Sequence, residues 1–402
     1  MPWKIISLDQ GRWRLVKALL QAQKSVQELS RHFGVSRKTA YKWKARFMEG
    51  GRRGLRDRPR QPRHSPRRLS PLWRKRIKVL RRRHRRWGGK KLHARLRALH
   101  AGGPVPAVRT ITRWLGRWQL SRKRRRRPPK GPVMPRRKLT LGRRANAVWT
   151  VDFKGWWRTA DRCRVEPLTV RDLYSRYVLA VRVLPDQQWE RVQRVFLGLF
   201  RRYGLPRVIR VDNGGPFGST GPAGLSRLSA WWVSVGLRVE FIRPAHPQDN
   251  GAHEQMHREL KGEAARPVSS TARAQQRRLE RWRRGYNQVR PHEALAQQPP
   301  SRKYRRSARR YNRRALRWQY APGWAVRRVR SNGQIRWAGR LRFVGEAFVG
   351  YRVGLRGKAT GVWHVYFHHI LLGELRALDR CGLRPAVYHS GRFHKGAKKP
   401  KV

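Results

Sequence analysis

The chain has 402 residues, which is long enough for two to four domains with buried cores. Hydrophobic residues make up 39% and aromatic residues 10%, so the composition excludes a disordered polyelectrolyte. The 99 Lys and Arg residues against 21 Asp and Glu give a net charge of +78, which predicts a polyanionic partner, above all nucleic acid. Frequent Arg and Trp in a GC-rich genome is the alternative source of this charge, so charge alone does not identify the partner.

Cysteine usage and hydropathy indicate the compartment. Cys163 and Cys381 lack the spacing of a zinc site or a disulfide framework, which fits a reducing cytoplasm. The N-terminus has no signal-type apolar core, and the apolar stretch around Leu179 is interrupted by Arg176 and Arg182. We therefore expect a cytoplasmic, nucleoid-associated protein with no membrane partner.

The first expected unit, residues 1–50, has the pattern of a helix-turn-helix. Two amphipathic stretches precede a tight turn at Gly34, and Ser36 is a good N-cap for a third helix. Basic and polar side chains on the third helix are candidates for major-groove contacts: Arg37, Lys38, Tyr41 and Lys44. A three-helix packing unit without a DNA role is the alternative, and the basic composition favours DNA binding.

A second helical unit is expected at 71–120, after a Gly- and Pro-containing linker at 51–70. Three apolar stripes predict three helices, and the last helix leaves Arg109 and Arg113 partly outward. The unit resembles another helix-turn-helix, and two such units would suit a long, bipartite DNA site. The Arg- and Pro-rich segment 121–147 is expected to be a basic linker that is solvated or lies along phosphates.

The pattern changes at Val148, and residues 148–300 predict an α/β domain. The expected elements are strands Val148–Phe153, Pro167–Val170 and Tyr177–Val183, helix Trp189–Tyr203, strand Pro206–Val211, a helix near 225–236, strand Arg238–Ile242 and helix Gly251–Glu263. This order fits a ribonuclease-H-like fold. Residues 272–320 are expected to be helical and very basic, and alternating runs beyond Gly323 predict a small β-barrel within 301–402.

Three acids stand where strands end or a helix begins. Asp152 lies within the first strand, Asp212 ends the fourth, and Glu254 lies in the first turns of the last helix. Adjacent strand ends and a helix N-terminal turn can converge on one point. Two Mg²⁺ or Mn²⁺ ions roughly 3.5–4 Å apart, held by such carboxylates, suit in-line phosphodiester chemistry. Each acid alone would be read as structural, but in this order of elements the three together predict a catalytic metal site.

Neighbouring residues offer alternatives around Glu254. Glu259 and Glu263 are rival third acids, although Glu259 is five residues on, points away from Glu254 and is expected to pair with an Arg. His257 and Lys261 lie one and two turns from Glu254 on the same helix face. Both are candidate DNA-phosphate contacts: we favour that role for Lys261 and leave it open for His257.

Five segments resemble bacterial insertion-sequence transposases with a retroviral-integrase-type core: WTVDFKGWW, PLTVRDLYSRY, RVIRVDNGGPF, RPAHPQDNGAHEQMHRELK and YNQVRPHEAL. The resemblance covers nearly the whole chain, including both helical units and the C-terminal barrel. It implies that Asp152, Asp212 and Glu254 are the acidic triad, and it singles out Glu254 over its rivals. The separation of Asp212 and Glu254 (254 − 212 = 42) is longer than in the compact retroviral group, and residues around 219–225 resemble the insertion usual in this branch.

The resemblance also implies an activity. It indicates a Mg²⁺-dependent DDE-type DNA transposase that binds terminal inverted repeats, frees the 3′-hydroxyl ends and joins them to target DNA, with two divalent cations as cofactors. Because two ends are joined, we expect a homo-oligomer on double-stranded DNA. The alternatives are a non-catalytic DNA-binding regulator derived from a transposase, and a nuclease on the same core. The intact triad and the paired helix-turn-helix units favour the transposase.

Overall fold

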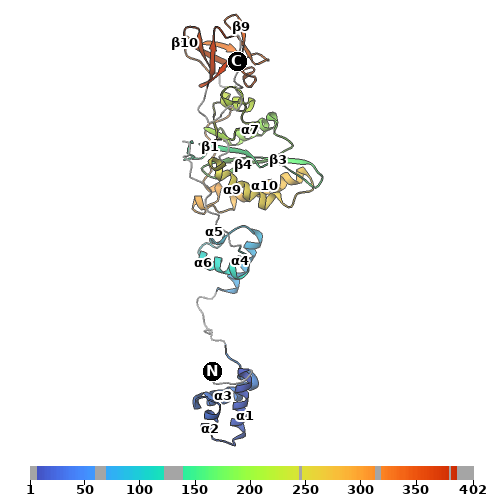
Figure 1. Cartoon of the computed structure of the whole chain (residues 1–402), viewed down its shortest axis with the longest axis vertical. Coiled ribbons are helices and arrows are strands. Elements are labelled where there is room, and N and C mark those ends of the chain that lie inside the picture. Colours follow the sequence, from blue (N-terminus) through green and yellow to red (C-terminus); the bar gives the residue numbers. More distant parts are fainter. Residues whose placement is uncertain are drawn as a thin grey trace, which may run out of the picture. The chain divides into compact units, whose positions relative to one another are not determined.

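The computed structural model of the chain describes residues 7–58, 69–121, 139–243, 247–312, 318–379 and 382–386 (Figure 1). The chain divides into two compact units, Met1–Ser70 and Pro71–Val402. Most of the predicted linker at 121–147, and Cys381, lie outside the described residues. Within the described ranges, no helix is long and apolar enough to cross a membrane.

The first unit consists of three helices, α1 (Leu8–Gln21), α2 (Val26–His32) and α3 (Arg37–Gly54). Gly34 turns the chain with a φ of 63°, and the Ser36 hydroxyl caps α3 by accepting a hydrogen bond from the backbone N–H of Thr39. The apolar faces of all three helices form the core, which includes Leu15, Val16, Leu29, Ala40 and Trp43. The backbone of α3 is kinked at Gly50 and Gly51, where the predicted linker begins; a further helical turn follows, and Leu55 after it is buried in the same core.

The second unit begins with three more helices, α4 (Pro71–Arg83), α5 (Gly89–Leu99) and α6 (Val108–Arg117). The predicted apolar stripes supply most of their buried residues, namely Ile77, Leu80, Leu92, Leu96, Ile111 and Leu115. Leu72 and Leu99, at the ends of two stripes, are instead half exposed. The first and last turns of a helix have packing neighbours on one side only, so the apolar pattern in the sequence extends beyond the residues that are buried.

A mixed sheet forms the centre of the second unit. Its strands are β1 (Val148–Phe153), β2 (Trp157–Arg158), β3 (Arg164–Asp172), β4 (Val178–Leu184), β5 (Val208–Val211) and β6 (Arg238–Phe241). Across the sheet they lie in the order β4-β3-β1-β5-β6, with β2 also paired to β3. Pairing is antiparallel among β4, β3 and β1 and parallel from β1 through β5 to β6.

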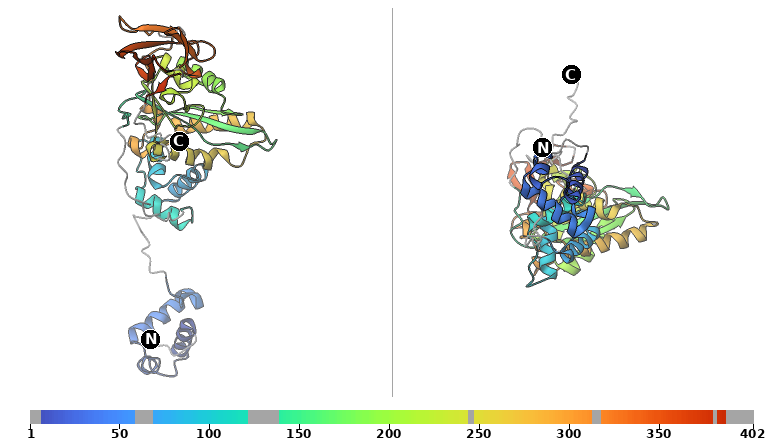
Figure 2. Two further views of the ribbon diagram at one scale, coloured as in Figure 1. Left: turned by 45° about the horizontal axis from the view of Figure 1, so that its top comes forward. Right: turned by 90° about the horizontal axis from the view of Figure 1, so that it is seen from below.

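Helices cover both faces of this sheet (Figures 1 and 2). Helices α7 (Trp189–Tyr203) and α8 (Arg227–Ser234) bury Phe196, Phe200 and Trp232 against one face. Helices α9 (Gly251–Leu260) and α10 (Ala272–Gln288) bury Met256, Leu260 and Leu279 against the other. This confirms the predicted ribonuclease-H-like arrangement of the central domain.

The region beyond α10 differs from the prediction. We expected helix throughout 272–320, but α10 ends at Gln288, and the described residues after it up to 320 form only short 3₁₀ turns at Glu293–Leu295 and Pro300–Arg302. The sequence supplies the reason, because Pro291, Pro299 and Pro300 lack the backbone donor that a helix interior needs.

The C-terminal region is rich in strands. These are β7 (Ala325–Arg328), β8 (Gln334–Trp337), β9 (Arg340–Phe343), β10 (Arg352–Ala359), β11 (Val362–Phe367), β12 (Ile370–Arg376) and β13 (Arg384–Pro385). Five form a sheet in the order β13-β12-β11-β10-β7, and β8 pairs with β9. In the described part of the chain the end strands β13 and β7 do not pair, so the β-rich region is confirmed and its closure into a barrel is not.

An ionic cluster fastens the α4–α6 unit to the central domain. Arg290, just after α10, donates to Glu259 on α9 at 2.8 Å and to Glu263 at 2.9 Å, and its guanidinium lies over the ring of Trp87 between α4 and α5. Lys91 on α5 also pairs with Glu259, at 3.6 Å. Because the Arg290 side chain is only 4% exposed, its charge depends on these two glutamates.

Replacing Arg290 with Leu should therefore loosen the α4–α6 unit. The change leaves two partly buried glutamates without their main partner, at a cost of roughly 3 kcal/mol. We expect faster amide hydrogen exchange in α4–α6, measured on the full chain by mass spectrometry. Arg284→Leu on α10 is the control, since Arg284 is 68% exposed and makes one long ion pair. Equal exchange in both variants would contradict the assigned role of Arg290.

Candidate active site

The pairing of β1 with β5 brings two predicted acids to one edge of the sheet. Thr150 on β1 is level with Arg210 on β5, and both strands run in the same direction. Two residues further along each strand come Asp152 and Asp212, which therefore lie side by side. Burial and then the charge of Asp212 raise the pKa of Asp152 to about 7, and burial also raises the pKa of Asp212.

Helix α9 supplies the third predicted acid. Glu254 lies in its first turn, is partly exposed, and is close enough for its charge to raise the pKa of Asp152 further. His253 directly precedes Glu254, and His257 lies one helical turn after His253. Both histidines are buried against the sheet. The structure therefore brings all three predicted acids to the same region.

A buried hydrogen-bond network joins α9 to the strands beneath it. The Thr169 hydroxyl on β3 donates to the Asp152 carbonyl at 2.8 Å and lies 2.7 Å from Nε2 of both His253 and His257. Since the single hydroxyl proton of Thr169 is used, both histidines must donate from Nε2. Nδ1 of His253 then accepts from the Thr150 hydroxyl at 2.8 Å.

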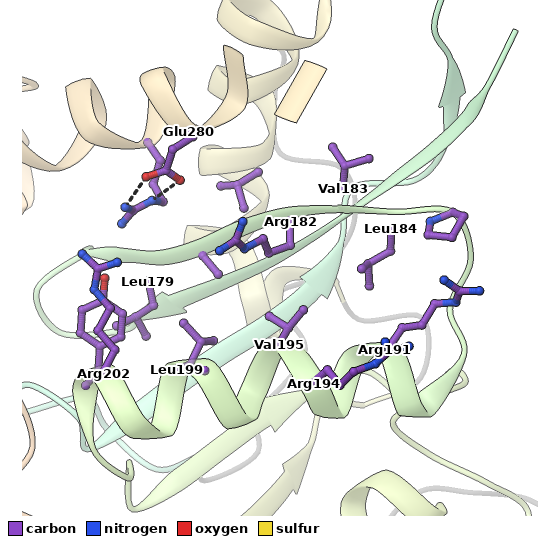
Figure 3. Close-up of a pocket in the computed structure, with 16 residues that line it drawn as sticks. Leu179, Arg182, Val183, Leu184, Arg191, Arg194, Val195, Leu199, Arg202 and Glu280 are labelled. Atoms are coloured by element: carbon purple, nitrogen blue, oxygen red, sulfur yellow. Dashed lines mark hydrogen bonds and ion pairs between the residues drawn. The ribbon is translucent and has the colours of Figure 1, made fainter. Parts of the chain in front are cut away.

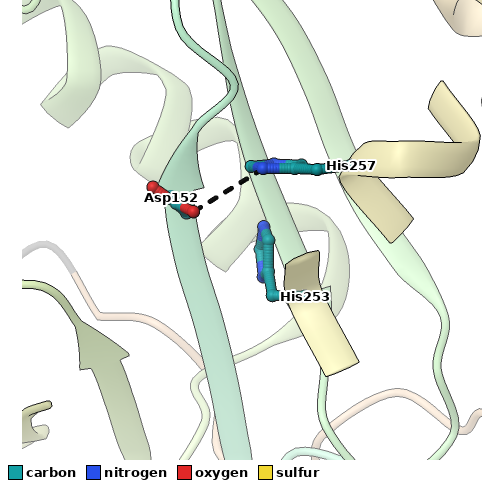
Figure 4. A group of neighbouring side chains, drawn as sticks. All are labelled: Asp152, His253 and His257. Carbon is teal, nitrogen blue, oxygen red and sulfur yellow. Dashed lines mark ion pairs between the residues drawn. The ribbon is translucent and has the colours of Figure 1, made fainter. Parts of the chain in front are cut away.

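The same reasoning shows whether the remaining nitrogen, Nδ1 of His257, carries a proton. Burial, followed by Lys154 and Arg171, lowers the pKa of His257 to about 3, so its ring is neutral. With the proton on Nε2, the lone pair of Nδ1 faces Asp152 Oδ2 at 3.6 Å (Figure 4). His253, His257 and Asp152 could hold a metal ion by distance alone, yet both nitrogens of His253 already have hydroxyl partners. We therefore interpret His253 as a residue that holds α9 against the sheet and not as a metal ligand.

Several predictions about neighbouring residues can now be compared with their positions. Glu259 pairs with Arg290, as expected, and Glu263 does the same, so both rival acids are engaged in the ionic cluster. His257 is buried beside Asp152, and its role toward DNA phosphate, left open above, stays a prediction. Lys261 is exposed and lies near Lys154, whose pKa is lowered by burial and then by the charge of Lys261.

Sequence reasoning missed Thr150, Thr169, His253 and Lys154. The spacing of His253 and His257, four residues apart on the helix that carries Glu254, was a usable signal for a shared buried face. The two threonines offered none, because their meeting depends on the pairing of β1 with β3. Opposite Asp152 in that register stands Thr169.

The candidate DNA contacts of the helical units lie mainly at the surface. Arg37, Lys38 and Tyr41 on α3 are exposed, and Lys44 is partly buried. On α6, Arg109 and Arg113 are exposed. These positions are compatible with the predicted role without testing it.

A large groove lies away from the acids, at the free edge of β4 (Figure 3). It has a volume of about 770 Å³ between β4, α7 and α10, and its lining includes none of the predicted site residues. Side-chain amides from α10 satisfy the edge of the strand: Asn287 bonds to the backbone of Val178, and Gln276 bonds to Val181 and Val183. These bonds occupy backbone groups through which an edge strand could pair with another chain.

The network beneath Asp152 can be tested through Thr169. Thr169→Val keeps the shape of the side chain but removes the hydroxyl that two histidines and a carbonyl share. Leaving these buried groups unpaired should cost about 1–3 kcal/mol and lower the urea midpoint of the second unit. Thr112→Val, at an exposed hydroxyl bonded within its own helix, should change stability by less than about 0.5 kcal/mol. If both variants matched the parent protein, the network would not fasten α9.

Comparison with known proteins identifies domains along most of the chain. The matches are a helix-turn-helix domain at 12–63, a homeodomain-like domain at 39–115, integrase core domains at 142–247 and 235–300, and the C-terminal domain of IS481 family transposases at 324–376. A structure of the HTLV-2 integrase catalytic core domain in complex with magnesium aligns at 14% identity with a TM-score of 0.33, over 41% of this chain and all of that one.

Two insertion-element proteins are relatives in sequence. The 39.2 kDa protein of insertion element IS476 from Xanthomonas euvesicatoria is 32% identical over 223 residues, which is 54% of this chain and 60% of the relative. The 31.7 kDa protein of insertion element IS407 from Burkholderia multivorans is 30% identical over 179 residues, or 44% of this chain and 62% of the relative. The chain thus spans about three fifths of each relative. Together with the domain matches, they confirm the resemblance found in the sequence: the chain contains helix-turn-helix and integrase core domains and is similar to the proteins of bacterial insertion elements.

Proposed function

We propose that the protein is a DNA transposase that cleaves DNA and transfers strands at a metal centre formed by Asp152, Asp212 and Glu254. The observation that carries the proposal is the meeting of these three acids at one edge of an integrase core domain. The engagement of Glu259 and Glu263 by Arg290 supports Glu254 as the third member.

The charge of the three acids fits a cationic cofactor. In the part of the chain that the structure describes, neither Asp212 nor Glu254 forms an ion pair, and the partner of Asp152 is a neutral histidine. Three carboxylates so close together repel one another, as the raised pKa of Asp152 reflects. Two Mg²⁺ or Mn²⁺ ions bound here would activate the attacking oxygen and stabilise the leaving one.

The surrounding residues would orient the acids and the DNA strand. Through Thr169, His253 and His257 hold α9 at a fixed register on β1 and β3, and so fix Glu254 relative to Asp152. Lys154 and Lys261 place two positive charges near Asp152, where they would bind phosphates of the strand being cut or joined.

The helical units would recognise the ends of the element. We propose that Arg37, Lys38, Tyr41 and Lys44 on α3, and Arg109 and Arg113 on α6, contact terminal inverted repeats. The joining of two ends implies a homo-oligomer on DNA. Closure of the C-terminal strands into a barrel that adds phosphate contacts stays part of this proposal.

The acid assignment is tested by two matched variants. Glu254→Gln should abolish Mg²⁺-dependent joining of terminal-repeat DNA, because loss of a metal ligand removes several kcal/mol of transition-state stabilisation, a loss of roughly 10³-fold or more. Its DNA affinity should stay close to that of the parent. Glu263→Gln should lower stability and leave joining within about tenfold after correction for the folded fraction. Joining that survives Glu254→Gln and is lost in Glu263→Gln would reverse the assignment.

End recognition is tested on α3. Lys38→Ala should reduce the preference for terminal-repeat over random duplex by about 1–3 kcal/mol if Lys38 contacts a base. Fluorescence anisotropy with both duplexes measures this preference. Lys17→Ala on α1, also exposed, removes the same charge and should leave the preference unchanged. An equal loss of affinity for both duplexes in Lys38→Ala would assign Lys38 to phosphate and not to a base.

A further inference from the structure

The segment 303–309, here called the strap, is laid across the amino ends of β1 and β5. Tyr304 anchors it: its ring is buried and stacked on Tyr177 at 4.4 Å, and its hydroxyl donates to the Asn146 side chain. The amide of Asn146 donates in turn to the carbonyl of Arg305 at 2.8 Å. The strap is therefore tied to the loop that begins β1.

Backbone hydrogen bonds hold the other end of the strap. Ser307 donates its N–H to the carbonyl of Tyr203 at 2.9 Å, and Leu205 donates to the carbonyl of Arg309 at 2.7 Å. The guanidinium of Arg309 donates to the carbonyls of Pro206 and Gly236. An exposed segment without helix or strand is thus fixed in place by the ends of α7 and α8.

Cations from the strap face cations from the sheet. Lys303, Arg305 and Arg306 are exposed, and together with Arg144, Arg207 and Arg309 they line a hollow of about 410 Å³, here called the strap groove. A second hollow, of about 430 Å³, shares Arg144 and Arg207 and is also lined by Arg143 and by Arg238, which pairs with Glu240 at 3.4 Å behind the lining. Among the described residues that line the two hollows there is no Asp or Glu.

This charge is unbalanced even for so basic a chain. In the groove of Figure 3, Glu280 pairs with Arg283 at 2.6 Å, and Arg191 pairs with nearby Asp186 at 3.1 Å. In the strap groove, Arg309 meets carbonyls only, and the charge of Arg207 adds to burial in lowering the pKa of Arg309. The fold therefore holds several like charges together without acids in the lining, and an anion would relieve their repulsion.

The strap groove lies at the opposite end of the strands from the acids. Val208 begins β5 and Asp212 follows it, so four residues at about 3.3 Å each separate the two ends by roughly 13 Å. One strand of a duplex carries a phosphate for roughly every 3.4 Å of helix axis, so a phosphate bound at the start of β5 lies about four nucleotides from the phosphate at the acids. The strap itself can extend up to roughly 20 Å, which matches a row of backbone phosphates better than a single small anion.

We propose that the strap groove binds the phosphate backbone of duplex DNA about four nucleotides or more from the phosphate that reacts. The proposal rests on the proposed function only for the identity of the partner as DNA. In this role the strap holds the flank of the duplex while the acids act at the other end of the sheet. Its recognition is of charge and shape, without reading of sequence.

The test compares two double variants of the full chain. Arg207→Gln with Arg306→Gln removes two groove cations, and Arg194→Gln with Arg201→Gln removes two exposed cations from α7. Binding of a fluorescent duplex without terminal repeats is measured over a series of KCl concentrations in EDTA. The groove variant should lower the slope of log K against log salt by about 1.8, since each lost phosphate contact contributes about 0.9. The α7 variant should leave the slope within error.

Equal slopes in the two variants, or an unchanged slope in the groove variant, would overturn the proposal. Lys303→Glu gives a second measurement at a fully exposed position, and it should weaken binding more than Arg201→Glu does. Mg²⁺-dependent joining is measured separately on the parent and on Glu254→Gln. If joining fails while the slope changes as expected, the transposase assignment fails and the groove stands; the reverse result rejects the groove alone.

Discussion

The parallel pairing of β1 with β5 is the constraint on which the site depends, because it sets two carboxylates side by side in a partly buried place. Their repulsion is visible in the pKa of Asp152, raised to about 7 by burial and by Asp212. In a chain with 21 acids among 99 cations, such a pair could be neutralised by arginine. The fold instead places neutral groups beside Asp152: the Thr169 hydroxyl donates to its backbone carbonyl, and the neutral ring of His257 lies 3.6 Å from its carboxylate, so neither cancels its charge. A divalent cation, as proposed above, would neutralise the two carboxylates.

Helix α9 connects this site to the rest of the second unit because its faces have different partners. His253 and His257 fasten one face to β1 and β3, while Glu259 and the following Glu263 hold Arg290 and, through it, Trp87. Glu254 stands on the same helix as both attachments. A displacement of the α4–α6 unit would therefore act on the helix that positions the third acid. One physical link between the α4–α6 unit and the three acids is therefore a helix of ten residues.

The sequence was most informative where local rules decide the outcome. The bounds of β1 and α7 follow from apolar period and turn chemistry, and the cap at Ser36 follows from the side chain itself. The positions of Asp152 and Asp212 followed from strand ends, since adjacent parallel strands bring such residues together. Long-range pairing was out of reach: the meeting of Thr169 with two histidines needs the register of β1 on β3. The prediction of helix throughout 272–320 was wrong because prolines end the helix, although the composition of the segment favours one.

The distribution of charge gives the net +78 a structural meaning. Many of the acidic side chains are engaged in ion pairs and hydrogen bonds, as in the cluster at Arg290 and the bonds of Glu240 to Arg210 and Thr140. Some of the remaining cations lie close together because hydrogen bonds hold the backbone that carries them. The strap is the clearest case. A flexible basic tail could follow any polyanion, whereas a strap tied to α7 and β1 offers its charges in one arrangement. Its fixed distance from the acids then lets the strap groove and the acidic edge act on separate stretches of one bound nucleic acid.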